Sequence, residues 1–282
     1  MAIKAWWYKA GGNNFGDVIC PILLRTLTGQ EIEFSRDEGT LVSIGSVAFH
    51  PYDNKMLFWG CGALKNKSRH KHQHAHRILA VRGPRTRECF LREGFDCPEV
   101  YGDPGIILPL LYPREAIANE QRFEVGILPH YVDYQRVAKF KVVQDERIDL
   151  IDICGETIDV LKAITACDML ITSSLHGLII GEAYSIPTAF IEFGKKLYGR
   201  LFKFEDYFNS TNRELSYYRC HRKWSFNLNK IEKFMAKKQN PQFDLREKLL
   251  RAFPYSITHP GVLDFLSGKT TPDSNGSHTP VI

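Results

Sequence analysis

The sequence predicts an α/β protein made of two Rossmann-like domains that face each other across a cleft. Short apolar segments typical of strands alternate with helix-like segments, and this rhythm occurs twice, on either side of a polar stretch at residues 112–121. Such alternation is typical of parallel sheets covered by helices. The length of 282 residues agrees with two domains, given a typical domain size of about 150 residues.

The composition is that of a globular protein with an ordinary interior. Hydrophobic residues make up 44% and charged residues 24%, which excludes collagen-like, low-complexity, coiled-coil and disulfide-scaffold classes. The balance of 37 basic against 32 acidic residues leaves a net charge of +5 without any Lys/Arg block, so nucleic-acid binding is not expected.

Three further features predict a cytoplasmic location. The amino-terminal segment MAIKAWWYKA lacks the apolar core of a secretion signal, and no later segment reaches the ~20 apolar residues of a membrane span. The seven cysteines are scattered and form no CxxC pair, which is typical of free thiols in a reducing compartment.

The first domain is expected to span residues 1–118. We predict strands at residues 3–8, 40–44, 56–59 and 78–81, with a helix at 17–28 that carries Pro21 in its opening turn. Three of these strands run into the glycines Gly45, Gly60 and Gly83. Because parallel strands end at a shared edge, where α/β proteins bind ligands, Gly45 and Gly60 are candidate binding positions.

The second domain is expected to span residues 119–258 and to end in closing helices. We predict strands at residues 125–128, 142–143, 149–153, 169–172 and 188–193, and helices at 156–167, 175–184 and 245–253. The polar segment at residues 267–282 is predicted to be a disordered tail.

The segment ILAVRGPRTR at residues 78–87 predicts an anion site. A buried strand ends at Arg82, and Pro84 opens a helix whose free N–H groups lie beside Arg82 and Arg85. Guanidinium groups bind carboxylate or phosphate through paired hydrogen bonds. The alternative is that Arg82 pairs with an acidic side chain while Arg85 lies on a solvated helix face.

The segment MLITSSLHGLIIGE at residues 169–182 predicts a catalytic histidine. Ser173 or Ser174 can cap the helix that follows the strand. His176 then lies in the first turn, where the helix dipole favours the neutral ring until an anion binds. A histidine of this kind suits general acid catalysis, although a structural histidine is the simpler alternative.

Two other segments carry polar residues in suggestive patterns. The turn GGNNFGD at residues 11–17 offers small residues and Asp17 at the head of a helix, but it is neither a Walker loop nor a full G-x-G-x-x-G motif. The alternating histidines of RHKHQHAH could share one face of a strand, yet no cysteine or carboxylate accompanies them at ligand spacing. We therefore expect a polar loop, and no metal, at His70, His72, His74 and His76.

Several segments in order give the chain its resemblance to a known family. They are GNNFGD at 12–17, the strand end Ile44-Gly45-Ser46, FWGCG at 58–62, VRGPRTR at 81–87, YGDPGIILP at 101–109, ITSSLHGLIIGEAYSIP at 171–187, and IEFGKK and KFEDYF within 191–208. Through them the chain resembles the polysaccharide pyruvyl transferase family. The resemblance implies a GT-B-like cytoplasmic enzyme that moves the pyruvyl group of phosphoenolpyruvate onto a sugar as a cyclic ketal and releases phosphate, without a metal or other cofactor.

The resemblance and the motifs together assign roles to particular residues. His176 is expected to be the general acid and Arg82 the clamp on the donor's carboxylate or phosphate, supported by Arg85. The other expected binding residues are Ser173 and Ser174 at the phosphate, Asn13, Asn14, Gly16 and Asp17 at the acceptor sugar, and Glu192 and Lys195 as second-tier candidates. The expected acceptor is a lipid-linked oligosaccharide of a capsule, exopolysaccharide or cell-wall pathway, reached at the inner membrane face.

Two other functions remain open at this point. A nucleotide-sugar glycosyltransferase of the same architecture would use a glutamate such as Glu192 to contact a ribose. A non-catalytic glycan-binding relative would keep the fold, but the presence of both Arg82 and His176 argues against it.

Overall fold

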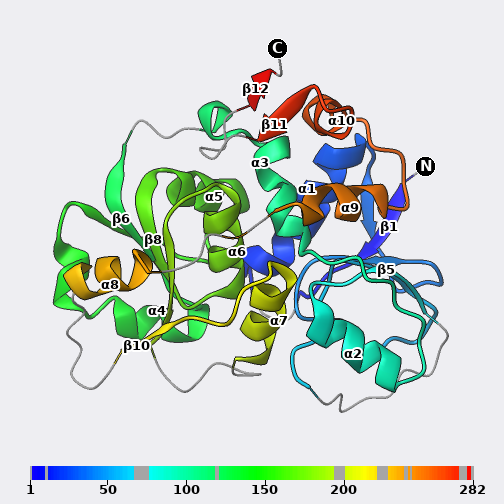
Figure 1. The fold of residues 1–282 in the computed structure, drawn as a ribbon, viewed down its shortest axis with the longest axis horizontal. Helices are drawn as coiled ribbons and strands as arrows, with labels where there is room; N and C mark the ends of the chain where they lie inside the picture. Colours follow the sequence, from blue (N-terminus) through cyan, green and yellow to red (C-terminus); the bar gives the residue numbers. More distant parts are fainter. Residues whose placement is uncertain are drawn as a thin grey trace.

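The computed structural model describes residues 2–9, 12–66, 76–117, 121–193, 201–220, 228–237, 241, 243–272 and 278–280. Two five-stranded sheets dominate this part of the chain, and every strand pair within them is parallel. Figure 1 shows one sheet in each half of the molecule, with helices between and around them. The predicted α/β class with two Rossmann-like halves agrees with this arrangement.

The first sheet has the strand order β2-β1-β3-β4-β5. Its strands are β1 (Ile3–Trp6), β2 (Ile32–Phe34), β3 (Leu41–Val42), β4 (Leu57–Trp59) and β5 (Arg77–Ala80). Helix α1 (Phe15–Thr28) follows β1, and helix α2 (Pro84–Arg92) follows β5. Because all the strands run the same way, the loops that carry Gly45, Gly60 and Arg82 leave the sheet at one edge.

Helix α1 begins at Phe15, two residues before the predicted start. The carbonyl of Asn14 accepts hydrogen bonds from the backbone N–H groups of Asp17 and Val18, and this closes the extra turn. Pro21 therefore lies inside the helix and not in its opening turn, which corrects the prediction. The helix ends at Gly29, whose φ of 65° is the left-handed conformation that glycine adopts at little cost.

The second sheet has the strand order β10-β9-β8-β6-β7. Its strands are β6 (Phe123–Leu128), β7 (Ile148–Leu150), β8 (Cys167–Thr172), β9 (Thr188–Glu192) and β10 (Tyr218–Arg219). The helices of this half are α4 (Tyr131–Val137), α5 (Thr157–Thr165), α6 (Leu175–Ala183) and α8 (Leu228–Met235).

The strand predicted at residues 142–143 is wrong. These residues belong to a short 3₁₀ helix, η3 (Lys141–Gln144). The backbone N–H of Val143 donates to Phe140, and that of Asp145 donates to Val142, so the chain turns before it enters β7. Two β-branched residues favour a strand locally, but the turn hydrogen bonds at Val143 and Asp145 hold this segment in a 3₁₀ conformation.

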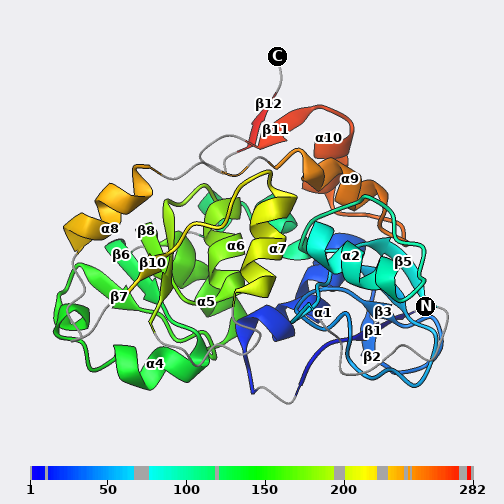
Figure 2. The same ribbon diagram turned by 60° about the horizontal axis from the view of Figure 1, so that its bottom comes forward.

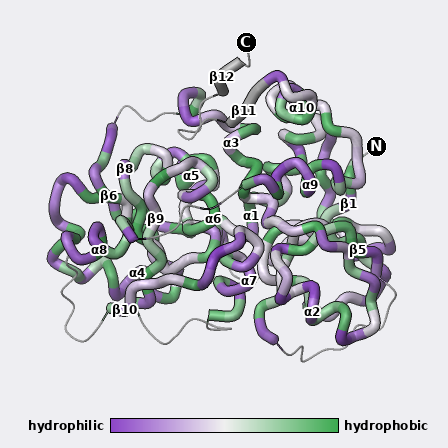
Figure 3. The backbone as a smooth tube through the Cα atoms, in the orientation of Figure 1, coloured by the Kyte–Doolittle hydropathy of each residue, from purple (hydrophilic) through white to green (hydrophobic). Residues whose placement is uncertain are grey.

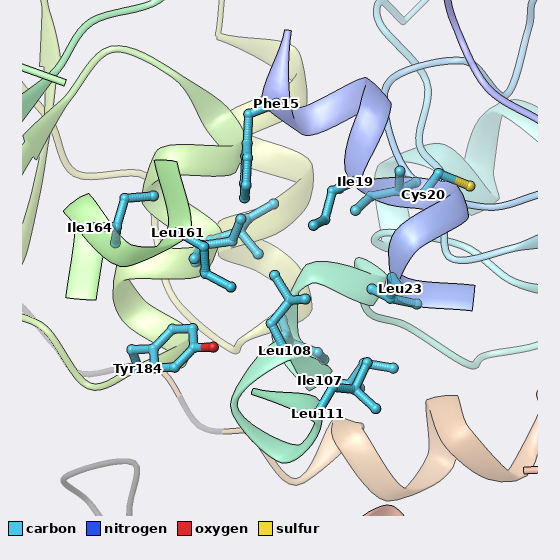
Figure 4. Packing of buried hydrophobic residues seen from close by; sticks show 14 of the residues in the cluster. Phe15, Ile19, Cys20, Leu23, Ile107, Leu108, Leu111, Leu161, Ile164 and Tyr184 are labelled. Atoms are coloured by element: carbon cyan, nitrogen blue, oxygen red, sulfur yellow. The ribbon is translucent and has the colours of Figure 1, made fainter. Parts of the chain in front are cut away.

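The two halves share one apolar core. Its buried residues come from both sheets and from α1, α5, α6, η1 (Pro104–Ile107) and α3 (Leu108–Leu111). In Figure 4, Phe15 of α1 points toward Leu161 of α5. The backbone N–H of Phe15 also donates to the carbonyl of Ile153 at 2.9 Å. Figure 3 shows that hydrophobic residues gather at the centre, around α6 and α3, and that helices farther out, such as α8, contain more hydrophilic residues. A layer of buried helices therefore joins the sheets, while a GT-B-like cleft stays a prediction.

The last helices return to the first half of the molecule, as Figure 2 shows for α9. They are α7 (Phe202–Ser210), α9 (Leu245–Arg251) and α10 (Pro260–Leu266). A short 3₁₀ helix, η2 (Arg114–Ala116), lies earlier in the chain, between the two sheets in sequence. The indole N–H of Trp59 donates to the carbonyl of Leu249 at 2.8 Å. Arg246 is buried, and its guanidinium donates to the carbonyls of Ile106 and Ala183.

The carboxyl-terminal segment, predicted to be disordered, contains two short strands. Strand β11 (Thr270–Pro272) pairs antiparallel with β12 (His278–Pro280). All seven cysteines are free, and five of them are buried. Among the helices of the described ranges, none combines the length and the apolar character that crossing a bilayer requires.

Candidate active site

The candidate site lies where the carboxyl end of the second sheet meets the amino-terminal ends of α1 and α6. Strand β8 ends at Thr172, and the hydroxyl of Ser174 accepts from the N–H of Gly177 as the cap of α6. The Thr172 hydroxyl donates to the carbonyl of Leu128 at 2.6 Å, which ties the strand end to its neighbour β6. His176 is therefore held in the first turn of α6, as the sequence predicts.

His176 is brought against the other half of the molecule by Gly16. A Cβ atom built on Gly16 would collide with the His176 ring at Nδ1, so only glycine lets α1 and this ring approach so closely. The His176 side chain is 9% exposed. Burial is the main cause that lowers the pKa of His176 to about 3, and the positive charges of Lys203 and Arg82 add to it. The ring is thus neutral at pH 7.

Asp103 faces His176 from the first half. Its Oδ1 atom accepts from the N–H of Gly105 at 3.0 Å, as the cap of η1. Its Oδ2 atom lies 3.8 Å from Nε2 of His176, and neither of these buried atoms has a hydrogen-bond partner within the part of the chain that the structure describes. Burial raises the pKa of Asp103 to about 6, against the effects of the Gly105 N–H and of Arg82.

Sequence reasoning missed Asp103 as a site residue. The signal that could have found it is Asp103-Pro104-Gly105, where an acidic residue caps a short helix that opens with proline. An aspartate in that position is normally structural, and only the fold brings its second oxygen to His176.

Arg82 does not present a free guanidinium. It is completely buried, and it donates to Asp206 Oδ2 at 3.0 Å, to Ser46 Oγ at 2.8 Å and to the carbonyl of Ala63 at 2.7 Å. Asp206 also accepts from the backbone N–H and the hydroxyl of Thr86. The start of α2 therefore binds the protein's own Asp206 carboxylate, at the position where the prediction places an anionic ligand. The alternative in which Arg82 pairs with an acidic side chain is the one the structure shows.

Arg85 is also engaged by α7. It forms an ion pair with Glu205, and its guanidinium carbon lies 4.6 Å from the centroid of the Phe202 ring. These contacts join α2 to α7 at the boundary between the halves.

The first turn of α1 contributes a second carboxyl group, that of Asp17. Asn14 Nδ2 donates to Asp17 Oδ2 at 2.6 Å, and Asn13 is exposed. Gly45 comes close to the same side chain, because a Cβ atom on Gly45 would lie 3.3 Å from Asp17 Oδ1. Burial raises the pKa of Asp17 to about 6, although Asn14 and Lys203 act in the opposite direction. Asp17 can thus hold or release a proton near neutral pH.

Lys203 is the second residue that sequence reasoning missed. It lies in the first turn of α7, is 8% exposed, and has its ammonium 5.3 Å from the centroid of the Phe204 ring. No residue in the described ranges gives it a hydrogen bond or an ion pair. Burial and the charge of Arg82 lower the pKa of Lys203 to about 8, while Asp17 raises it. A lysine in an ordinary amphipathic helix gives no sequence signal of such burial.

Ser173 is completely buried, and the protein already uses its hydroxyl. It accepts from the backbone N–H of His130 at 2.8 Å and donates to Asp133 Oδ2 at 3.2 Å. These bonds fix His130 beside the site, where burial and Lys203 lower the pKa of His130 to about 3. Ser173 therefore positions its neighbours, and Ser174 caps α6.

The remaining candidates are less central. Gly60 has a φ of 85°, and a Cβ atom there would lie 2.5 Å from Pro104 Cδ, so it lets η1 pack against β4. Glu192 accepts from Arg219 Nε at 2.8 Å. Lys195 lies outside the described residues.

The histidine cluster is described only in part, because His70, His72 and His74 lie outside the described residues. His76 accepts from the backbone N–H of Met56 at 3.0 Å through Nδ1, and its ring stacks on Phe95. The described part of the chain contains no group of three His, Cys, Asp or Glu side chains that could hold a metal ion.

Comparison with known proteins adds a family to this geometry. The family model for polysaccharide pyruvyl transferase matches residues 14–193, which run from the start of α1 to the end of β9. An uncharacterized protein of Acanthamoeba polyphaga mimivirus, L143, is 34% identical over 121 residues. This match covers 42% of the present chain and 42% of the viral protein, so the chain spans less than half of that relative. No solved structure matches the chain.

Proposed function

The chain belongs to the polysaccharide pyruvyl transferase family, and we propose that it transfers the pyruvyl group of phosphoenolpyruvate to a sugar. The family supports a transferase that acts in polysaccharide biosynthesis. The proposal adds phosphoenolpyruvate as the donor and a cyclic ketal on two hydroxyls of one sugar as the product. The proposed acceptor is a lipid-linked precursor at the cytoplasmic membrane face, and the proposed architecture is GT-B-like.

The observation that carries the proposal is the pair formed by His176 and Asp103. Their two buried polar atoms face each other at 3.8 Å and have no hydrogen-bond partner among the described residues, and such unpaired atoms cost stability. Catalytic hydrogen bonds are often long in an unliganded enzyme and shorten when substrate binds. We assign His176 the role of proton donor and Asp103 the role of positioning its ring.

The reaction needs a proton before it needs a nucleophile. Protonation of the methylene carbon of phosphoenolpyruvate gives a methyl group and leaves positive charge on the central carbon. A sugar hydroxyl attacks that carbon and loses its proton, and phosphate then leaves with the bonding electron pair. The second hydroxyl attacks the resulting cation, and its proton completes the balance of one ketal and one hydrogen phosphate.

The charges in the site suit these steps. An incoming dianion favours the protonated form of a nearby histidine, so donor binding raises the pKa of His176 from about 3 and prepares it to give up a proton. Asp17, with its pKa near 6, is our candidate for the base that receives the hydroxyl proton. Asn13 and Asn14 lie beside it in the turn and are proposed to contact the acceptor.

The test is to incubate the purified protein with phosphoenolpyruvate and a panel of lipid-linked and synthetic glycosides. Release of inorganic phosphate together with a product heavier by one pyruvate less one water supports the proposal. A parallel panel of nucleotide sugars checks the alternative transferase. Release of nucleoside diphosphate there, with no reaction of phosphoenolpyruvate, would overturn the proposal in favour of a glycosyltransferase.

A further inference from the structure

Lys203 carries a positive charge in a buried position, and no described residue forms an ion pair with it. Its side chain is more than nine-tenths buried, and within the described ranges it has neither a hydrogen bond nor an ion pair. The contact with the Phe204 ring at 5.3 Å is weak, and the 8% exposure of Lys203 leaves its ammonium group only a small part of its hydration. Buried charges in proteins are normally paired, so this one calls for an anion.

The groups around Lys203 come from four elements that meet at the site. They are Asp17 of α1, Arg82 after β5, His130 before α4 and His176 of α6, each of which interacts electrostatically with Lys203. Arg82 already has its counter-charge in Asp206. Both histidines are neutral at pH 7. Asp17, with a pKa of about 6, is mostly ionised at pH 7 and favours the charged form of Lys203, but it lies beyond ion-pair distance. The surroundings therefore compensate the Lys203 charge only in part.

The first turn of α6 adds hydrogen-bond donors near the same place. In an α-helix the first N–H groups lack partners within the helix, and the Ser174 cap satisfies only that of Gly177. Among the described residues, the N–H groups of Leu175 and His176 have no hydrogen-bond acceptor, and the helix dipole favours negative charge there. A phosphate dianion, with several acceptor oxygens, matches an ammonium and two amides better than a single carboxylate does.

We propose that Lys203 and the first turn of α6 bind the phosphate group of the donor. This inference rests on the proposed function for the identity of the donor, whereas the ligand class, a phosphate dianion, is argued from the Lys203 ammonium together with the N–H groups at the start of α6. It gives Lys203 the role that the sequence assigned to Arg82. It also places the phosphate beside His176, where its negative charge favours the protonated ring.

The experiment compares Lys203→Met, Lys203→Arg and wild-type protein, with Lys162→Met as a matched control on the exposed face of α5. Binding of inorganic phosphate, phosphoenolpyruvate and pyruvate is measured by calorimetry, and unfolding midpoints are measured in urea. Lys203→Met should bind phosphate and phosphoenolpyruvate at least tenfold more weakly, with pyruvate binding unchanged. Lys203→Arg should recover part of the affinity, and Lys162→Met should match the wild type.

The stability measurement separates binding from folding. Lys203→Met removes an uncompensated buried charge, so its unfolding midpoint should equal or exceed that of the wild type. Unchanged phosphate binding in a folded Lys203→Met variant would overturn the inference, as would equal losses of phosphate and pyruvate binding. Phosphate binding that depends on Lys203 in a protein with no turnover of phosphoenolpyruvate would support the phosphate site and refute only the proposed reaction.

Discussion

Gly16 and His176 touch across the boundary between the two halves of the molecule. Gly16 lies in the first turn of α1, His176 lies in the first turn of α6, and no space remains between them for a side chain on the glycine. The position of the histidine ring is thus set by a residue of the opposite half.

Replacing Gly16 with alanine should displace the His176 ring without unfolding the protein. The added Cβ would overlap the ring at Nδ1, and a misplacement of about 1 Å can cost about 100-fold in rate. We expect kcat for phosphate release to fall by about that factor. Val18→Ala, in the same helix, is the control and should keep its activity. A Gly16→Ala enzyme with normal kcat would show that ring position does not limit the reaction.

The substitution His176→Gln should remove the proton donor and leave the donor site in place. General acid catalysis contributes about 10²–10⁴-fold, so phosphate release should fall within that range. Calorimetric titration should still detect phosphoenolpyruvate. The control is His259→Gln, at the start of α10. Normal turnover by the His176 variant would refute its catalytic role.

Asp103→Asn should affect kcat more than KM. Asparagine keeps the oxygen that caps η1 through Gly105 but removes the charge that faces His176. We expect kcat to fall by about tenfold or more, with a changed pH profile as the sign of a positioning role. Asp96→Asn, at an exposed position, should behave as the wild type. An unaltered profile together with unaltered kcat would exclude that role.

Breaking the Arg82–Asp206 pair should lower stability first. Both side chains are fully buried, and removal of one partner from such a pair costs about 3–5 kcal/mol. Asp206→Asn should therefore lower the free energy of unfolding measured in urea by about that amount, whereas Lys4→Met, which breaks an exposed pair with Asp37, should leave it close to the wild-type value. A stable Arg82→Met protein with a raised KM for phosphoenolpyruvate would restore the clamp role.

The same site makes stability depend on pH in two opposing ways. His176 has a folded pKa of about 3 against an ordinary 6.5, so the unfolded chain binds more protons and stability falls as pH drops below 6.5. Asp103 has a folded pKa of about 6 against 3.8, so protonation of the folded chain adds stability as pH drops below 6. Each effect amounts to about 1–2 kcal/mol between pH 7 and pH 5.

Urea denaturation at pH 7 and pH 5 checks this balance. Relative to the wild type, His176→Gln should lose less stability on acidification, and Asp103→Asn should lose more. Parallel shifts in all three proteins would contradict the opposite signs that we assign to the two groups.

Local patterns were enough to predict much of the second sheet and its site. One short segment contains the apolar run that ends at Thr172, the capping residue Ser174 and the start of the helix that carries His176. Such features depend on neighbours in the chain, which the sequence displays directly.

The partners of the charged residues could not be predicted in the same way. Arg82 and Asp206 are separated by 124 positions, and only the packing of α2 on α7 makes them a pair. The burial of Lys203 follows from the same packing. The motif around Arg82 left a bound ligand and an acidic side chain open as alternatives, and the tertiary structure places the Asp206 side chain there.

Arg246 of α9 links the carboxyl-terminal helices to the segments that carry the site. Its guanidinium bridges the carbonyl of Ile106, three residues after Asp103, and that of Ala183, at the end of the helix that begins beside His176. The segments that hold His176, our proposed proton donor, and Asp103, which positions its ring, are thus both hydrogen-bonded to one arginine far along the chain. A truncation that removes α9 and the residues after it would remove both hydrogen bonds at once, while every residue of the site remained present.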